Sequence, residues 1–167
     1  METRTALVGI GANLGDPAGQ VRRAMDALAA LASPAGALRR SGLWASRPVD
    51  CPPGSPDFVN AVVALPLAAG TEPRALLESL QRLEARAGRV RTIRNAPRLL
   101  DLDLLLVGET RLASPELVLP HPRAQERAFV LLPAAEVAPA LRWPGDGRTV
   151  AELAAAVPGR ETLRRLA

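Results

Sequence analysis

One segment limits the fold more than any other: residues 98–107 are almost entirely apolar, yet they contain Asp101 and Asp103. Side chains of a β-strand alternate between its two faces, so these acids would share one face and the neighbouring leucines the other. Such a leucine-rich strand is expected deep in a sheet, where an ionised carboxylate is costly unless it is paired or bound to metal. The segment therefore predicts a strand whose two acids need a cation.

Two sources of positive charge fit this acidic pair. Neighbouring positions on one face of a strand lie about 6.6–6.8 Å apart, which suits carboxylates that hold two metal ions roughly 3.5–4 Å apart. The alternative is a pair of acids at a strand end that form salt bridges with arginine, which is abundant in this chain. The strand alone leaves both interpretations open.

Arginine supplies all 21 basic side chains of the chain, and the net charge is +4. The sequence pI of 11.0 is high because no lysine or tyrosine can lose a proton before arginine does. It is therefore weak evidence for nucleic-acid binding. A P-loop requires lysine, so the sequence excludes one. Phosphate binding would depend on arginine, backbone amides or metal.

The length fits one domain, which we expect to span residues 1–167. The single cysteine, Cys51, excludes a disulfide within the chain and gives no reason to expect secretion. No apolar run approaches the roughly 20 residues of a membrane-spanning helix, and the first residues lack a signal-peptide pattern. We expect a cytoplasmic protein without a membrane segment. We also expect a monomer, because no additional apolar helix face offers an interface.

Hydrophobic periodicity and turn residues predict an alternation of strands and helices along the chain. Strands are expected at residues 5–11, 38–44, 58–65 and 98–107, with a weaker extended segment at 112–119; helices are expected at 17–31, 73–87 and 123–132 and after a capping box at Thr149 and Glu152; a turn is expected at 11–15 and a proline-rich loop at 45–56. This order predicts an α/β or α+β fold in which helices pack on a mainly antiparallel sheet.

Residues 88–98 form an arginine-rich loop directly before the acidic strand. They contain Arg89, Arg91, Arg94 and Arg98. Guanidinium groups bind phosphate oxygens and stabilise the charge that develops in phosphoryl transfer, while carboxylates hold Mg²⁺. A solvent-exposed basic surface is the common alternative for such a cluster. Because two acids follow at once, we favour a loop that closes over the phosphates of a nucleotide.

These features belong to a set of short motifs that follow one another along nearly the whole chain. The motifs occupy residues 11–16, 56–61, 81–84, 88–91, 97–104, 119–122 and 126–129. In this order they resemble the hydroxymethyl-dihydropterin pyrophosphokinases of folate biosynthesis. The resemblance implies a ferredoxin-like βαββαβ core with extra C-terminal strands and helices. It also implies transfer of the β,γ-pyrophosphoryl group from ATP to the hydroxymethyl oxygen of a reduced pterin, with release of AMP.

The resemblance also assigns roles to particular residues. The catalytic positions are Arg89, Arg98, Asp101 and Asp103, and the two acids would bind two Mg²⁺ ions. The positions around ATP are Gln81, Glu84, Arg91, Arg94, Leu104, His121 and Arg127. The positions around the pterin are Ser46, Val49, Phe58, Asn60 and Phe129. A flat heterocycle with a hydrogen-bonding edge needs aromatic faces and an amide that donates and accepts, which supports the two phenylalanines and the asparagine.

The sequence departs from the family pattern at three places. Asn95 and Ala96 stand where many members have Trp-Gly, so an aromatic lid is not expected. Glu116 replaces a frequent arginine before the Leu-Pro-His segment and removes one expected nucleotide contact. Phe58 replaces a common tyrosine and keeps only the stacking surface.

Two other classes of protein are compatible with parts of this pattern. A nucleic-acid-binding module on a ferredoxin-like sheet would stack bases on aromatic side chains, but aromatic residues make up only 2% of this chain. Two acids beside the basic loop would also repel a nucleic-acid backbone unless metal intervened. A metal-dependent nuclease or phosphatase is the second alternative. AMP production that requires a hydroxymethyl pterin would separate the pyrophosphokinase from both, and we expect no nucleic-acid partner.

Overall fold

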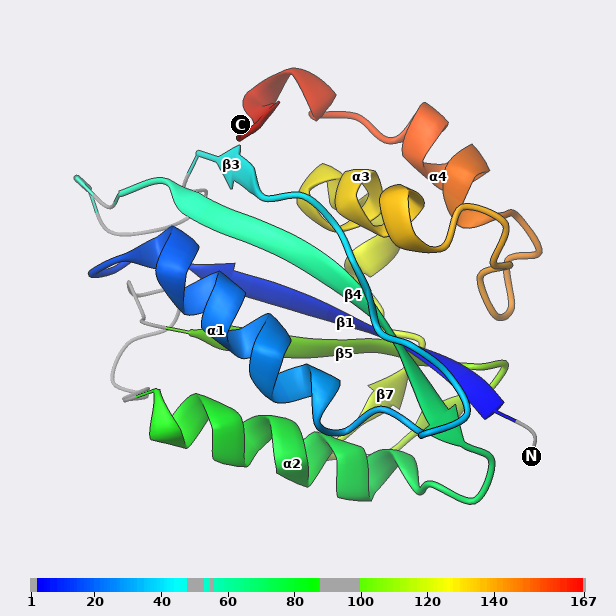
Figure 1. The fold of residues 1–167 in the computed structure, drawn as a ribbon. Helices are drawn as coiled ribbons and strands as arrows, with labels where there is room; N and C mark the ends of the chain where they lie inside the picture. Colours follow the sequence, from blue (N-terminus) through cyan, green and yellow to red (C-terminus); the bar gives the residue numbers. More distant parts are fainter. Residues whose placement is uncertain (1–2, 48–52, 55, 88–99, 167) are drawn as a thin grey trace.

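A single antiparallel sheet with helices on both faces forms the body of the protein in the computed structural model (Figure 1). The structure describes residues 3–47, 53–54, 56–87 and 100–166. The elements are β1 (Thr3–Ala12), α1 (Pro17–Ala29), β2 (Arg39–Arg40), β3 (Trp44–Ser46), β4 (Phe58–Ala68), α2 (Pro73–Arg86), β5 (Asp101–Val107), β6 (Leu112–Ala113), β7 (Val118–Leu119), α3 (Ala128–Val137), α4 (Val150–Ala156) and β8 (Leu163–Arg165), with short 3₁₀ helices η1 (Ala124–Glu126) and η2 (Arg160–Thr162).

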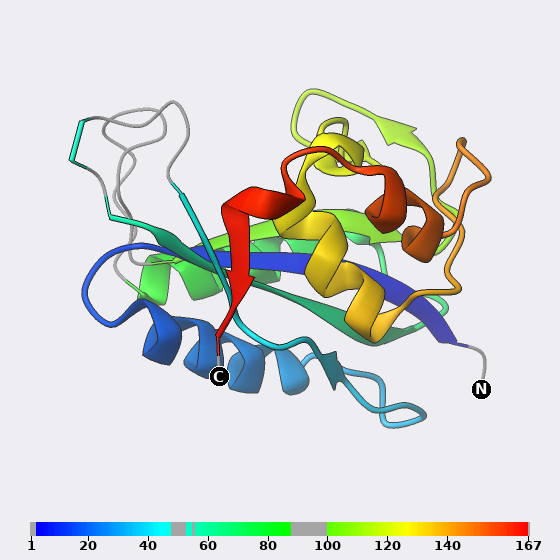
Figure 2. The ribbon, with the colours of Figure 1, turned by 90° about the horizontal axis from the view of Figure 1, so that it is seen from above.

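The strand order confirms the predicted ferredoxin-like core. The main sheet runs β5-β1-β4-β3-β8, and β2 also pairs with β4. Every pairing in it is antiparallel. Helices α1 and α2 cover one face, whereas α3 and α4 cover the other, and the second view shows the same three layers (Figure 2). The C-terminal helices and β8 are the predicted additions to the core.

Alternation along the central strands produces two apolar cores. On β1, Val8 and Ile10 pack with the residues of α1 and α2, whereas Leu7 packs with those of α3 and α4. On β4, Val62 and Ala64 also face α3 and α4, as the predicted period of two requires. Burial on both faces fixes the register of the sheet, because a slip of one residue would exchange the two cores.

The start of α1 follows from its sequence. The side chain of Asp16 accepts a hydrogen bond from the backbone N–H of Gly19 at 3.1 Å, and Pro17 occupies the first helical position. This confirms the predicted cap. No helix among the described residues is long and apolar enough to cross a membrane.

The predicted strand at residues 38–44 is wrong as one continuous element, because the structure divides it into β2 and β3. At the break, Ser41 donates its backbone N–H to the carbonyl oxygen of Val62 at 3.0 Å. The backbone N–H of Val62 donates in turn to the Ser41 hydroxyl at 2.9 Å, so a side chain replaces a carbonyl as acceptor. The Ser41 hydroxyl thus competes with a backbone carbonyl for the Val62 N–H and interrupts the backbone hydrogen bonding to β4. Strand β3 then continues to Ser46, inside the segment predicted as loop.

The expectation that the acidic strand lies deep in the sheet is also wrong. Strand β5 is at the edge of the described sheet and pairs only with β1. Its outer edge is protected, since the Leu102 N–H donates to the Glu84 carboxylate at 2.8 Å and the Leu105 carbonyl accepts from the His121 N–H at 2.7 Å. The leucine-rich composition reflects burial against both helical layers, and the edge position leaves room beside the acids.

Two further predictions of local structure need correction. The helix expected at residues 123–132 is two elements, η1 and α3, because Arg127 between them is extended, with φ −113° and ψ 110°. The extended segment expected at 112–119 is a short hairpin of β6 and β7. Its turn is held by Ser114, whose hydroxyl donates to the Leu117 carbonyl oxygen at 3.0 Å.

Candidate functional site

Two glycines of the central strand, Gly9 and Gly11, line a cavity on the α3 face of the sheet. Gly9 lies opposite Asp103 and Gly11 lies opposite both Asp101 and Asn60 in the sheet register. A Cβ atom added at Gly11 would lie 3.5 Å from Oδ1 of Asn60. The missing side chains leave a cavity of about 460 Å³ between α3 and the sheet. Glycine within a strand is typical of sites where a ligand approaches the backbone closely.

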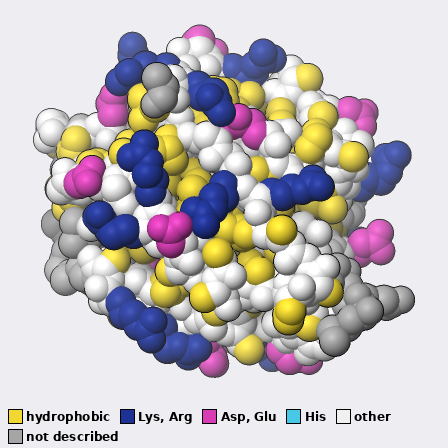
Figure 3. Space-filling model, in the orientation of Figure 1, with side chains coloured by type: hydrophobic (Ala, Val, Ile, Leu, Met, Phe, Trp, Pro, Cys, Tyr) yellow, Lys and Arg dark blue, Asp and Glu magenta, His cyan; other side chains and the backbone are white. Residues whose placement is uncertain are grey.

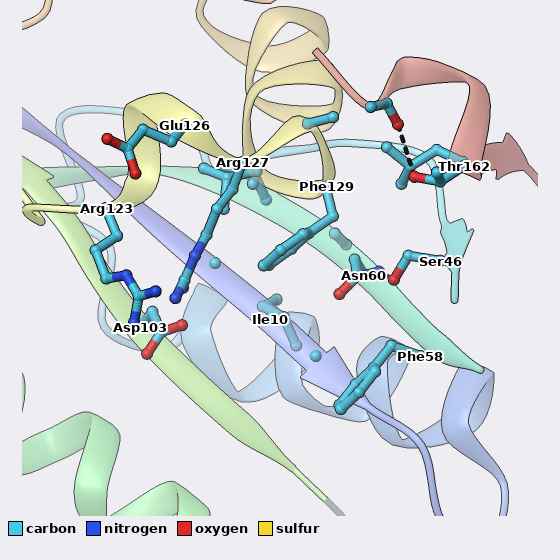
Figure 4. Close-up of a pocket in the computed structure, with 18 of the residues that line it drawn as sticks. Ile10, Ser46, Phe58, Asn60, Asp103, Arg123, Glu126, Arg127, Phe129 and Thr162 are labelled. Carbon is cyan, nitrogen blue, oxygen red and sulfur yellow. Dashed lines mark hydrogen bonds between the residues drawn. The ribbon is translucent and has the colours of Figure 1, made fainter. Parts of the chain in front are cut away.

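Aromatic side chains line this cavity from two separate elements. Phe129 projects from the first turn of α3, and Phe58 begins β4. Figure 4 shows both rings bordering the space above the sheet. The guanidinium carbon of Arg127 lies 5.5 Å from the centre of the Phe129 ring, a cation–π contact that fixes the two side chains relative to each other. The structure thus brings both predicted phenylalanines and Arg127 to one cavity.

A buried polar pair lies beside the aromatic residues. Asn60 is 5% exposed, and its side-chain N–H donates to the hydroxyl oxygen of Ser46 at 2.6 Å. Neighbouring strands hold these residues, since β3 pairs with β4. Both line the cavity, where Asn60 can present amide groups to the edge of a flat ligand. The predicted positions Ser46 and Asn60 are therefore together, whereas Val49 lies outside the described residues.

Asp101 and Asp103 form the boundary between this cavity and a second one. Both acids share one face of β5 and are half-buried, whereas Leu102 and Leu104 face the opposite core, as predicted. The two acids line the first cavity and also line a second cavity of about 420 Å³. A group held in either cavity therefore lies beside the same pair of carboxylates.

The second cavity collects most of the described residues that were predicted to surround ATP. Gln81 and Glu84 of α2, Leu104 of β5 and His121 line it, together with Glu116. Glu116 forms an ion pair with Arg74, at 3.1 Å between Oε1 and Nε. The acid that replaces the family's frequent arginine is thus matched by a cation from the start of α2. Arg127 lies on the other side, in the first cavity.

Glu84 supports the acidic strand from behind. Its side chain is 3% exposed, and Oε2 accepts the hydrogen bond from the backbone N–H of Leu102, the residue between the two acids. A strand restrained in this way keeps Asp101 and Asp103 in a fixed orientation. This contact gives Glu84 a positioning role in addition to its predicted place near ATP.

His121 is held as a neutral imidazole at neutral pH. Its Nδ1 accepts the backbone N–H of Arg123 at 3.2 Å, which leaves the proton of the neutral ring on Nε2. Burial lowers its pKa, and the positive charges of Arg127 and Arg123 lower it further, although the negative charge of Asp101 raises it. The neutral ring can donate one hydrogen bond from Nε2 into the second cavity.

The described residues supply only part of a metal coordination shell. No group of three or more His, Cys, Asp or Glu side chains suited to a metal occurs among them. Asp101 and Asp103 offer oxygen ligands only. Mg²⁺ fits this arrangement, because it commonly binds through one or two carboxylates and completes its shell with substrate phosphates and water. The donor set therefore fits a metal that arrives with a polyphosphate.

Some residues lie outside these observations, and others were not anticipated. Arg89, Arg91, Arg94 and Arg98 lie outside the described residues, so their predicted roles remain predictions. Gly9, Gly11 and Arg123 were not predicted as site residues, yet all three line the first cavity. The two glycines, spaced i, i+2 within a strand pattern, were a usable signal. Arg123 had none, because its position depends on the path of the chain after His121.

Comparison with known sequences agrees with this geometry. A sequence model described as 7,8-dihydro-6-hydroxymethylpterin-pyrophosphokinase matches residues 7–139. The 2-amino-4-hydroxy-6-hydroxymethyldihydropteridine pyrophosphokinase of Pseudomonas aeruginosa is 46% identical over 151 residues, which cover 90% of each chain. The enzyme of the same name from Synechocystis sp. is 36% identical over 148 residues, which cover 89% of this chain and 73% of the relative.

Solved structures share the fold at low sequence identity. A crystal structure of HPPK-DHPS in complex with substrates matches with a TM-score of 0.72 at 10% identity, over 99% of this chain and 47% of that one. Plasmodium falciparum HPPK-DHPS with pterin and p-hydrobenzoate matches with a TM-score of 0.70 at 12% identity, over 98% and 48% of the two chains. The present chain thus spans about half the length of these solved chains.

Proposed function

The chain belongs to the 7,8-dihydro-6-hydroxymethylpterin-pyrophosphokinase family, and we propose that its two cavities hold the two substrates of that reaction on either side of the acidic pair. The enzyme transfers pyrophosphate from ATP to the hydroxymethyl group of 6-hydroxymethyl-7,8-dihydropterin, a step of folate biosynthesis. The products are the pterin diphosphate and AMP. The observation that carries the assignment of the cavities is that Asp101 and Asp103 line both of them.

The first cavity suits the pterin. Phe58 and Phe129 provide flat apolar surfaces for a bicyclic ring, and Asn60 provides an amide at its edge. Because Asn60 is already fixed by Ser46, its amide loses little conformational freedom when a ligand binds. The ring would then lie above Gly9 and Gly11, with its hydroxymethyl group directed toward the acids.

The second cavity suits the nucleotide. Gln81, Leu104 and His121 border it, and the neutral imidazole can donate to an oxygen of the ligand. The triphosphate would extend from this cavity to Asp101 and Asp103. We propose that these carboxylates hold two Mg²⁺ ions, which when bound neutralise phosphate charge and polarise the phosphorus–oxygen bonds.

The chain's own residues orient the reacting groups. The hydroxymethyl oxygen forms a bond to the β-phosphorus of ATP, the bond from that phosphorus to the oxygen of AMP breaks with AMP as the leaving group, and the hydroxyl proton is released to solvent. If both substrates bind against the same pair of acids, the reaction between two separate molecules becomes a reaction within one complex. Such positioning lowers the activation free energy, because the entropy of bringing the reactants together is lost on binding and not in the chemical step. Arg89 and Arg98 are proposed to stabilise the transferring phosphates.

The surface gives little support to the nucleic-acid alternative. Among the described side chains visible in the orientation of Figure 1, arginines are scattered among acidic and apolar ones and form no continuous basic track (Figure 3). The two phenylalanines lie in a cavity instead of on an open sheet surface. A hydrolase remains the useful competitor, because paired acids also serve metal-dependent hydrolysis.

The decisive experiment measures AMP formation from ATP and Mg²⁺ with and without the hydroxymethyl pterin. We expect AMP only when the pterin is present, together with one pterin diphosphate per AMP. A hydrolase would instead release product from ATP alone. Calorimetry with a non-hydrolysable ATP analogue, with and without Mg²⁺ and followed by pterin, then tests whether metal and nucleotide bind together.

Three broader properties complete the proposal. We propose that residues 1–167 act as one domain and that the enzyme is a monomer, since residues of one copy line both cavities. We propose a cytoplasmic location, since ATP is supplied there. Light scattering of the purified protein tests the monomer, and an absence of binding to single-stranded or duplex oligonucleotides tests the expectation of no nucleic-acid partner.

A further inference from the structure

Arg123 is an arginine at the acidic pair for which sequence patterns assign no role. It precedes η1, its side chain is exposed, and it lines the first cavity together with Asp101, Asp103 and Arg127. Figure 4 shows the guanidinium groups of Arg123 and Arg127 both extending toward Asp103. The hydrogen bond from its backbone N–H to His121 fixes the start of the side chain near the second cavity.

The two arginines are held differently. Arg127 is half-buried and lies against the Phe129 ring, so its position is coupled to the proposed pterin site. Arg123 forms no ion pair within 4 Å with any other residue that the structure describes, although its head group faces the acids. An exposed, unanchored guanidinium can change rotamer and form a forked contact with a phosphate. Among the described contacts, Arg123 is thus the less restrained cation of the two.

The local charges explain why such a cation would be useful. The described side chains that line the first cavity include three acids and three arginines, namely Asp101, Asp103, Glu126, Arg47, Arg123 and Arg127, so a metal ion that arrives alone meets little net charge on this side of the site. A triphosphate brings the negative charge that both the metal and Arg123 can share. The same arginine would therefore disfavour metal binding without nucleotide and favour binding of the metal–nucleotide complex.

We propose that Arg123 is a phosphate-binding residue that contacts the polyphosphate of the nucleotide beside Asp103 and makes metal binding dependent on nucleotide. The proposal rests on the proposed function, since it requires a nucleotide at the acidic pair. Its alternative is that Arg123 is only a counter-ion for the carboxylates, with no contact to the ligand.

Calorimetry on the intact protein separates these two roles. We expect Arg123→Ala to weaken binding of a non-hydrolysable ATP analogue in saturating Mg²⁺ by about ten- to hundredfold, the range for hydrogen bonds to charged groups. Mn²⁺ alone should bind the variant at least as tightly as the wild type. Arg123→Lys, which keeps the charge but loses the fork, should recover part of the nucleotide affinity. Affinity for the pterin should change little.

The matched control is Arg22→Ala, since Arg22 is an exposed arginine on α1, on the opposite face of the sheet. It should leave every binding constant unchanged. Equal nucleotide affinity in Arg123→Ala and the wild type, at equal thermal stability, would overturn the proposal and leave the counter-ion role. Failure of the wild type to form AMP with pterin would instead overturn the proposed function, so the two failures are distinguishable.

Discussion

The two cavities that meet at Asp101 and Asp103 are built on different principles. The first is bordered by Phe58 and Phe129 and contains an amide already fixed by Ser46. The second is bordered by exposed polar groups such as Gln81 and by the neutral His121. Under the proposed function, the first would select by shape and a few preset hydrogen bonds, whereas the second would depend on charge that arrives with the ligand and its metal. The acidic pair belongs to both.

The largest effect on turnover should come from substituting the two acids that line both cavities. Asp101→Asn or Asp103→Asn keeps the side-chain size but removes the charge that we propose holds the metal. We expect turnover to fall by about a thousandfold or more, since metal stabilisation of phosphoryl transfer amounts to several kcal/mol. Steady-state rates of AMP formation measure this loss.

The fold should survive these substitutions, because both acids are half-buried at an edge strand and lie outside the apolar cores. The matched control is Asp26→Asn, which breaks only a surface ion pair with Arg40. Near-normal turnover in either Asp101→Asn or Asp103→Asn would remove the acids from the mechanism.

A second substitution should separate the two cavities. Phe129→Ala removes one face of the proposed pterin stack, and we expect pterin affinity to fall by about 1–3 kcal/mol, roughly five- to 150-fold. Affinity for the ATP analogue should stay within about twofold, because Phe129 does not border the second cavity. Phe129→Tyr, which keeps the ring, is the control. Equal losses for both ligands would mean that the cavities are not independent.

The glycine lining of the first cavity offers a finer test of selection by shape. Gly11→Val places a branched side chain between Asn60 and the acids, and β-branched residues are compatible with a strand. We expect pterin affinity to fall by about tenfold, or roughly 1.4 kcal/mol, as measured by calorimetry. Gly70→Val is the control, since nothing lies within 4 Å of a Cβ atom added at Gly70. An unchanged pterin affinity would place the ring elsewhere.

The features of this site that the sequence could predict are local ones. The shared face of Phe58 and Asn60 and the Asp16 cap follow from periods of two and from side-chain chemistry at helix ends. The pairing of Asp101 with Asp103 on one face of β5 follows in the same way.

Other features depend on contacts between distant segments, which no local pattern encodes. The edge position of β5 depends on the order in which all the strands of the sheet pair. The hydrogen bond that protects this edge joins Leu102 to Glu84, eighteen residues earlier in the chain. The break at Arg127, which brings Arg123 and Arg127 over the acids, depends on the chain path after His121. The leucine-rich composition of β5 therefore correctly predicted that the strand packs against helices on both faces. It did not predict that the strand lies at the edge of the sheet.

The smallest expected effect is a pH dependence that belongs to the second cavity. The pKa of His121 is lowered in the folded protein from its ordinary value of 6.5 by burial and by two arginines. Below about pH 6.5 the unfolded chain binds a proton at this residue more readily than the folded one does. Stability contributed by the neutral ring is thus fully present above pH 6.5 and is lost as the pH falls through the lowered pKa.

Denaturant unfolding of the protein without nucleotide, from about pH 7.5 to about pH 5, measures this dependence. Carboxylates also begin to titrate at the lower end, so the difference between the wild type and His121→Gln isolates the imidazole. We expect the wild type to lose more stability than the variant over this range. Bound nucleotide should reduce the difference, because nearby phosphates favour the protonated ring and offset the two arginines. Identical pH profiles with and without nucleotide would place the phosphates away from His121, on the pterin side of the acids.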